Sequence, residues 1–174
     1  MKKFVLNHRK RWTLSIAIFQ LLGALVSLYL IFTVVANNGI SFAVVFAVLP
    51  ILGITLVSLF AGIFYFIKGE KNELRFFTLS KLNFCVHFLQ LAVPGFAFIY
   101  YYGPYLAFGF DGDFSFLLRF QTLTINFAFS IGSTDGEHEV LFNIIPIIPL
   151  LALRWIERNP VESPDPEKAF VEEG

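Results

Sequence analysis

Long apolar runs flanked by basic residues constrain this chain more than any other feature of its sequence. Twelve of the thirteen Lys and Arg residues lie at one end or the other of such a run, always on the same side of an implied membrane, and only Arg119 departs from this sorting. Lysine and arginine concentrate on the cytoplasmic side of membrane proteins. The sequence therefore predicts an integral membrane protein with both termini in the cytoplasm.

The composition agrees with a membrane protein and excludes several other classes. Of 174 residues, 56% are hydrophobic and 15% are charged, whereas a soluble domain carries about 25% charged residues. The net charge of zero leaves no basic patch that would favour direct binding of nucleic acid. The single cysteine, Cys85, excludes an intramolecular disulfide and a CxxC redox pair.

The apolar runs predict four transmembrane helices. At a rise of about 1.5 Å per residue, some 20 residues cross a hydrocarbon core of about 30 Å. We expect an all-α integral membrane protein, a four-helix transmembrane bundle with spans at 13–35, 40–67, 76–102 and 139–157. The first run and its basic start also fit a signal peptide, although the run exceeds the roughly 7–15 apolar residues typical of one.

Three polar segments are expected in the cytoplasm. They are a basic arm at 1–12, a loop at 68–75 and a tail at 158–174. The tail is rich in proline and acidic residues and cannot bury enough apolar surface to fold alone, so we expect it to be disordered.

The segment 103–138 is predicted to be a small β-rich insertion on the extracytoplasmic side. Polar and apolar residues alternate over 122–131, which is typical of a strand, and Asp111-Gly112 between two apolar runs favours a hairpin turn. A re-entrant apolar segment at 123–131 is the alternative interpretation.

A line of polar residues marks one face of the predicted third span. Ser80, Asn83, His87 and Gln90 follow one another at steps of three, four and three residues, which places them on one helical face. Exposing such groups to lipid is costly, so the face should point into a bundle. It either forms hydrogen bonds between helices or lines a polar, proton-responsive pathway around His87.

The first two spans carry small and polar residues at helical spacing, a pattern that indicates close helix packing. These candidate packing residues are Gln20, Gly23 and Ser27 in the first span and Ala43, Ala47, Ser58 and Gly62 in the second. If the polar faces of the spans meet, their polar side chains form hydrogen bonds within each protomer. If they face outward together, they build a homo-oligomer, with or without a central pore.

The sequence shows no catalytic or metal-binding pattern that withstands scrutiny. Asp111 and Asp113 lack the twelve-residue ladder of an EF-hand. Cys85 and His87 are two residues apart in the predicted third span and point to different faces, and His138 should lie near the outer surface. We therefore expect no enzymatic activity, no metal and no cofactor.

These features favour a non-enzymatic membrane subunit that senses or scaffolds. It would couple the outer β-rich surface to a cytoplasmic protein partner, and it would self-associate. The partner would bind loop 68–75 or tail 159–174, where the candidate docking residues are Glu167, Phe170 and Glu172. A small oligomeric channel or transporter subunit that uses the Ser80–Gln90 face is the alternative.

The layout of basic arm, four spans, outer segment and short tail resembles that of the membrane subunit of the Kiwa anti-phage system. The resemblance is one of layout and involves no residue motif. It implies a protein of the bacterial cytoplasmic membrane, the sensor of a defence system, that forms a tetramer and binds a cytoplasmic partner.

Overall fold

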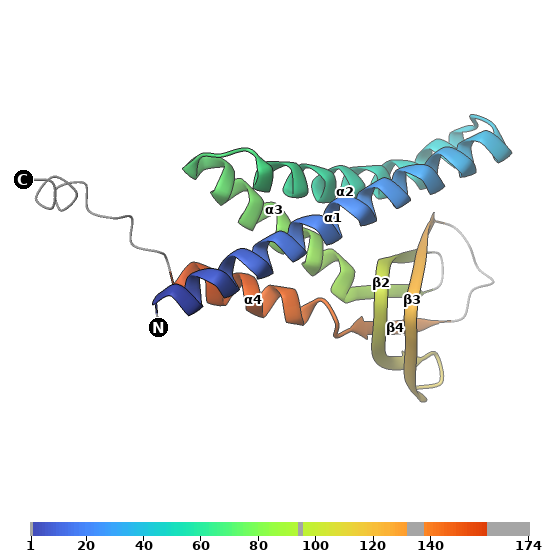
Figure 1. The fold of residues 1–174 in the computed structure, drawn as a ribbon. Coiled ribbons are helices and arrows are strands. Elements are labelled where there is room, and N and C mark those ends of the chain that lie inside the picture. Colours follow the sequence, from blue (N-terminus) through green and yellow to red (C-terminus); the bar gives the residue numbers. More distant parts are fainter. Residues whose placement is uncertain (1, 94–95, 132–137, 160–174) are drawn as a thin grey trace, which may run out of the picture.

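The computed structural model describes residues 2–93, 96–131 and 138–159 and shows helices joined to a curled sheet (Figure 1). The elements are α1 (Lys2–Asn38), α2 (Phe42–Phe66), α3 (Glu70–Phe88), β1 (Leu89–Val93), β2 (Phe96–Asp111), β3 (Phe116–Ile131), β4 (Glu139–Asn143) and α4 (Ile147–Arg158). The chain thus combines helices and strands in one fold.

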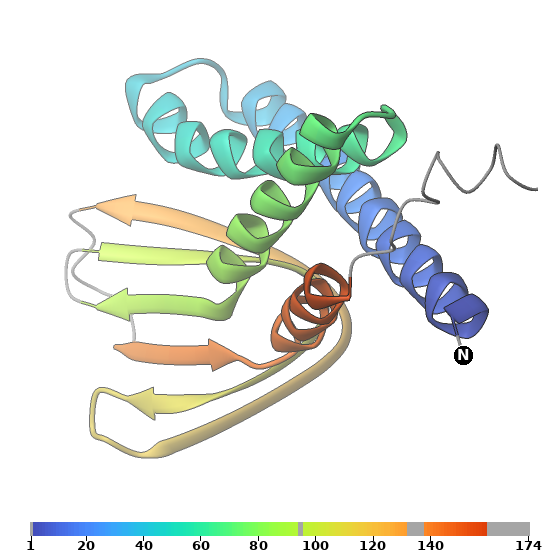
Figure 2. The same ribbon diagram turned by 90° about the vertical axis from the view of Figure 1, so that its left-hand side faces the viewer.

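Helices α1 and α2 form a long antiparallel hairpin and lie side by side in both ribbon views (Figures 1 and 2). Gly39 makes the connection with a positive φ of 70°, which suits glycine. The side chain of Ser41 then caps α2 by accepting a hydrogen bond from the Val44 amide. Within the described chain, the stretches His8–Asn38 and Phe42–Phe66 are long and apolar enough to cross a membrane.

The prediction of an all-α, four-helix transmembrane bundle is wrong. Among the described residues only α1 and α2 meet the length and hydropathy of a span, and four strands form an antiparallel sheet. Helix α3 has 19 residues, but they include five charged ones. Helix α4 has 12 residues, about 18 Å of helix, which is too short for a core of about 30 Å.

The predicted third span, 76–102, is a helix only in its first half. Helix α3 ends at Phe88, and the chain continues as β1 and the start of β2. The sequence between Leu89 and Tyr102 is apolar throughout, and periodicity alone cannot tell a buried strand from a buried helix in such a run. Its aromatic content and the turn-forming pair Pro94-Gly95 are the local signals that favour strands.

The predicted fourth span, 139–157, is also divided. Its first residues form β4, and the helix α4 begins only at Ile147, after Pro146 in the N-cap position. Pro149 lies in the first turn of α4, where its missing N–H costs no hydrogen bond. Both prolines therefore accompany the start of a short helix.

The sheet is antiparallel and curls because β2 is bent. Strand β2 pairs with β3 along its whole length, while its first part also pairs with β1 and its last part with β4. The register shifts between Gly103 and Tyr105, and Gly103 has a φ of 94°. Both ends of β2 therefore border the adjacent pair β1–β4, which rolls the sheet up (Figure 2).

The predicted β-rich insertion, 103–138, has the wrong limits, because the strands extend from Leu89 to Asn143. The hairpin turn lies where the Asp111-Gly112 pair predicts it. There the Asp111 carboxylate accepts hydrogen bonds from the amides of Asp113 and Ser115. The alternative of a re-entrant apolar segment is wrong as well, since β3 runs through 123–131.

Two buried clusters hold the layers together. One joins α1, α3 and α4 through residues that include Ile16, Phe76 and Leu153. The other joins α1, α2 and β2 through Ile31, Ile51, Tyr100 and Tyr102. The first half of β2 is thereby packed against the helical hairpin, while the β2–β3 turn projects away from it.

Candidate functional site

A buried polar cluster lies where α1, α2, α3 and β2 meet. We define the polar cluster as Gln20, Ser58, Ser80, Asn83 and Tyr102. Ser80 donates to the side chain of Gln20 over 3.0 Å, and Ser58 donates to the Gln20 carbonyl oxygen over 3.1 Å. Asn83 donates to the Tyr102 hydroxyl over 3.2 Å and to Ser58 Oγ over 3.3 Å. Hydrogen bonds therefore connect four elements in the middle of the protein.

The predicted polar line is only partly one face of a helix. Ser80, Asn83 and His87 share the buried face of α3, but Gln90 lies beyond the helix, in β1. The Gln90 side chain accepts a hydrogen bond from the Tyr105 hydroxyl over 2.9 Å. Ser80 and Asn83 form hydrogen bonds to neighbouring elements, whereas Gln90 belongs to the interior of the sheet.

The predicted packing residues fall into two groups. A Cβ at Gly23 would collide with the ring of Tyr102, and one at Gly62 would collide with the side chain of Leu21. Ser27 is buried as well, with 1% of its surface exposed. Ala43 is exposed and Ala47 is half-buried near the start of α2. The glycines are therefore needed where neighbouring elements approach closely, whereas Ala43 and Ala47 do not lie in such a contact.

His87 occupies a fixed position beside the polar cluster. Its ring is edge-on to Tyr100 and Tyr102, with centroid distances of 4.9 and 4.6 Å. The Nδ1 atom is 2.7 Å from the carbonyl oxygen of Asn83. Because a carbonyl only accepts, Nδ1 carries the proton, and in the neutral ring Nε2 is an acceptor. Nε2 is buried and has no hydrogen-bond partner in the part of the chain that the structure describes.

An apolar cavity of about 270 Å³ borders His87. Its walls come from α1, α3, β2 and the connection that leads from β4 into α4, and they include Trp12, Phe84, Ile148 and Pro149. Polar atoms contribute little to these walls. His87 therefore lies between a hydrogen-bonded polar cluster and an apolar space, which is the general character of a small-molecule site.

The inner face of the curled sheet is a second polar region. Tyr101 stacks on Tyr105 with a centroid distance of 4.2 Å, and Arg119 pairs with Glu139. These residues, Gln90 and Gln121 line a cavity of about 120 Å³. Burial raises the pKa of Tyr105 to about 12, and the neighbouring Tyr101 adds to this effect. The Tyr105 phenol therefore stays protonated and donates to Gln90.

The outer face of the same sheet is apolar. Along β3 the residues that face the inner cavity, such as Arg119 and Gln121, alternate with large apolar residues on the opposite face. The exposed apolar residues of this outer face are Phe108, Phe110, Phe116, Leu118 and Phe120. A sheet with a polar interior and an apolar exterior is the pattern of strands that face lipid. This alternation was readable in residues 116–121, although we predicted alternation only over 122–131.

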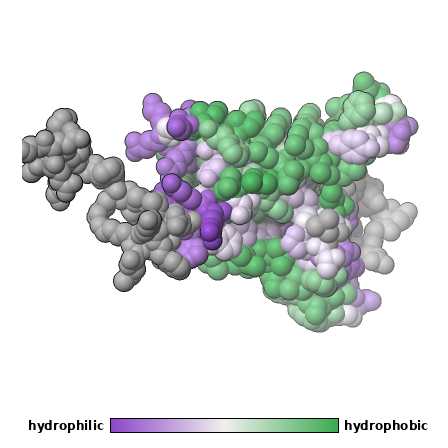
Figure 3. Space-filling model, in the orientation of Figure 1, coloured by the Kyte–Doolittle hydropathy of each residue, from purple (hydrophilic) through white to green (hydrophobic). Residues whose placement is uncertain are grey.

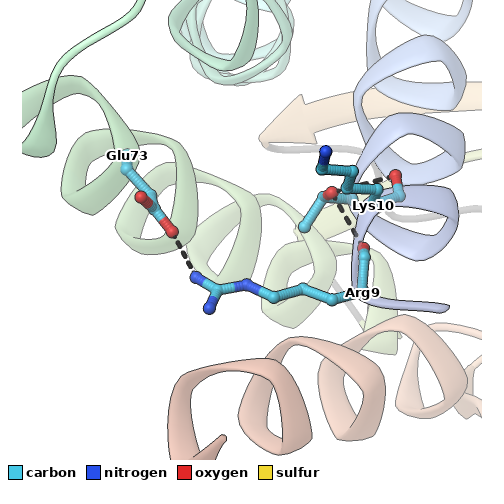
Figure 4. Close-up of polar contacts among 4 residues, drawn as sticks. Arg9, Lys10 and Glu73 are labelled. Carbon is cyan, nitrogen blue, oxygen red and sulfur yellow. Dashed lines mark hydrogen bonds and ion pairs between the residues drawn. The ribbon is translucent and has the colours of Figure 1, made fainter. Parts of the chain in front are cut away.

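Ion pairs join α1 to α3 and α3 to α4 at the end that holds the N-terminus. Figure 4 shows the pair between α1 and α3. Arg9 on α1 pairs with Glu73 on α3 over 2.5 Å, and Lys81 on α3 pairs with Glu157 on α4 over 2.5 Å. The N-terminus, the α2–α3 turn and the end of α4 lie at this same end, where hydrophilic residues are concentrated (Figures 1 and 3).

The predicted loop 68–75 is wrong in part, since α3 begins at Glu70.

The predicted docking residues and the expectation about metals remain to be compared with the structure. Glu167, Phe170 and Glu172, the candidate docking residues, lie outside the described residues. Within the described ranges, no group of three or more His, Cys, Asp or Glu residues could hold a metal ion.

Comparison with known protein families, with curated proteins and with solved structures gives no match to this chain. The likeness to the Kiwa membrane subunit depended on a layout of four spans. The described structure has two helices that could serve as spans, so that layout no longer supports the likeness.

Proposed function

We propose that this chain is a non-enzymatic membrane subunit that senses or scaffolds, coupling a sheet on the extracytoplasmic side to a cytoplasmic partner. The observation that carries the proposal is the distribution of polarity. Large apolar side chains cover the outside of α1, α2 and the sheet, while polar groups are gathered inside and toward the two ends (Figure 3). Such a distribution suits a protein surrounded by lipid.

The helical hairpin supports insertion into a bilayer. Phe32 is 72% exposed, and Leu22 and Leu49 are also exposed, on helices that carry their polar residues toward the polar cluster. Soluble monomers rarely expose contiguous apolar patches larger than a few hundred Å². We therefore assign α1 and α2 as the two membrane-crossing helices.

The sheet extends this apolar surface. Phe116 and Phe120 are 63% and 67% exposed on the outer face of β3. With α1 and α2 in the bilayer, this face would rest against its outer half, and the Asp111–Ser115 turn would reach the extracytoplasmic surface. Contact of the same apolar face with a second copy is the route by which the subunit would self-associate.

The basic residues support one orientation. Arg9, Lys68 and Arg158 lie near the N-terminus, the α2–α3 turn and the end of α4, which share one end of the protein (Figure 1). By the positive-inside rule this end would face the cytoplasm. The opposite end would then hold the α1–α2 turn.

Cysteine labelling tests this topology. In a Cys85→Ser background, Asn37→Cys and Asp113→Cys should react with an impermeant maleimide in intact cells, because both positions would lie outside. Lys71→Cys should react only after permeabilisation. Equal labelling of Lys71→Cys and Asn37→Cys in intact cells, or recovery of the chain in the soluble fraction, would overturn the proposal.

Partner recovery tests the scaffolding role. Deleting residues 159–174 should abolish recovery of a cytoplasmic partner in a pull-down while leaving the chain in the membrane fraction. The triple variant Glu167→Lys, Phe170→Ala and Glu172→Lys is the finer test of the predicted docking residues. Unchanged partner recovery with the deletion would exclude the tail as the docking segment.

A further inference from the structure

We propose that a pocket between α1, α2 and α3 binds the head group of an anionic phospholipid, whose acyl chains lie against the exposed apolar surface of α2. The inference rests on the membrane role proposed above, because a phospholipid reaches this pocket only where the N-terminal end of the protein meets a bilayer. It adds a ligand of stated chemistry to that role.

The pocket has a volume of about 490 Å³ and both charged and aromatic walls. Helix α1 contributes Arg9 and Lys10, the α2–α3 turn contributes Lys68, and Phe64 and Phe77 come from α2 and α3. Its volume lies within the range of about 300–1,000 Å³ that is usual for ligand sites. Basic pockets between membrane helices on the cytoplasmic side are where anionic head groups bind.

Lys10 and Lys68 supply the charge that an anionic group would meet. Both are exposed, and neither forms an ion pair with another of the described residues. Arg9 is paired with Glu73 over 2.5 Å (Figure 4), so Glu73 does not offset the two lysines. Among the described residues of the lining, two lysines and the carboxylate of Glu70 are then left without a partner. The pocket therefore keeps a net positive charge.

The wall that α2 forms continues into apolar surface. Phe64 and Ile67 line the pocket. Phe60 and Ile63 precede them by one helical turn on the same faces of α2, and both are exposed. Figure 3 shows hydrophobic surface directly beside the hydrophilic end. A free phosphate would contact only the charged part of this site, whereas a phospholipid would contact both parts.

The unpaired lysines select a head group with a net negative charge. A lysine ammonium binds phosphate as a compact point charge through short, charge-assisted hydrogen bonds. Phosphatidylglycerol offers its phosphate without a cation. Phosphatidylcholine brings a quaternary ammonium group that the lysines repel. The site should therefore prefer the first of these lipids to the second when their acyl chains are the same.

Native mass spectrometry of the full chain in a non-ionic detergent measures this preference. The chain would be titrated with dioleoylphosphatidylglycerol and, separately, with dioleoylphosphatidylcholine, and the dissociation constant of the first bound lipid would be determined. Since each lysine or arginine near an anionic surface contributes roughly a factor of 5 in affinity, we expect phosphatidylglycerol to bind at least about 10-fold more tightly. Glycerol 3-phosphate and inorganic phosphate, added at the same concentrations, should not displace it, because they lack acyl chains.

A matched pair of double variants locates the contact. Lys10→Gln with Lys68→Gln removes the two unpaired cations and should weaken phosphatidylglycerol binding at least about 10-fold, to the level of phosphatidylcholine. Lys71→Gln with Arg158→Gln removes the same charge from exposed positions that do not line the pocket. This control should bind phosphatidylglycerol like the parent chain. All four positions are exposed, so neither variant removes a buried contact.

Equal binding of the two lipids by the parent chain would overturn the proposal. Equal losses in the two double variants would also overturn it, because they would show attraction by overall charge. Displacement of the lipid by glycerol 3-phosphate or inorganic phosphate would assign the pocket to a soluble phosphate instead. The cysteine labelling described above tests the membrane topology independently, so a correctly inserted chain without lipid preference would refute the pocket alone.

Discussion

The helical part of the molecule and its curled sheet bury polar groups in different ways. Between the helices, Ser58, Ser80 and Asn83 form hydrogen bonds with one another or with side chains of neighbouring elements. Two atoms of this network, Gln20 Nε2 and Asn83 Oδ1, have no partner among the described residues. Inside the sheet, polar side chains surround a cavity, and Gln90 Nε2 has no partner among the described residues. The first network therefore links four elements directly, whereas the second surrounds a cavity with room for a ligand or water.

The largest expected effect is on the hydrogen-bond network between the helices. Ser58→Val would leave the Tyr102 hydroxyl, an Asn83 amide proton and the Gln20 carbonyl with fewer partners. Since each buried polar group left unpaired costs about 1–3 kcal/mol, we expect a loss of at least about 2 kcal/mol. Unfolding in mixed detergent micelles would measure the change in free energy.

Thr78→Val is the control for Ser58→Val. Thr78 is exposed, and among the described residues its hydroxyl bonds only to the Leu74 carbonyl of its own helix. Its removal should change the free energy of unfolding by less than about 0.5 kcal/mol. Similar losses for the two variants would contradict the special role of the polar cluster.

A smaller effect is expected where the sheet meets the helices. Gly23→Ala places a Cβ against the ring of Tyr102, and overpacking of this kind costs about 1–3 kcal/mol. Gly53→Ala is the matched control, because a Cβ at Gly53 meets nothing within 4 Å. It should instead stabilise α2 by about 0.5–1 kcal/mol. The same unfolding assay measures both variants. An unchanged free energy of unfolding in Gly23→Ala would show that the contact with Tyr102 is loose.

The smallest effect concerns the interior of the sheet and depends on pH. The pKa of Tyr105 is raised to about 12 from an ordinary value of about 10, so folding favours the protonated phenol. The resulting stabilisation is fully present below pH of about 10 and is lost as the pH rises toward about 12. Unfolding midpoints measured across this window should fall less in Tyr105→Phe than in the parent chain. Identical slopes would mean that Tyr105 is not shielded in the folded protein.

Parts of this architecture were predictable because they depend on local sequence. The lengths of the apolar runs identified α1 and α2, and the spacing of Ser80, Asn83 and His87 identified the buried face of α3. Tyr102 was not predicted as a partner of that face, because we placed it at the far end of the same helix. Its hydrogen bonds to Ser58 and Asn83 exist only because the chain reverses after Phe88.

By itself, the sequence determined where long helices form, where charge collects and where the β2–β3 turn lies, since run length, charge and turn chemistry act over a few residues. Only the tertiary structure decided that 89–93, 96–102 and 139–143 become strands. These segments are apolar enough for either state, and strand pairing with distant residues selects between them. The cavity beside His87 and the polar interior of the sheet arise from the same long-range pairing, which no local pattern specifies.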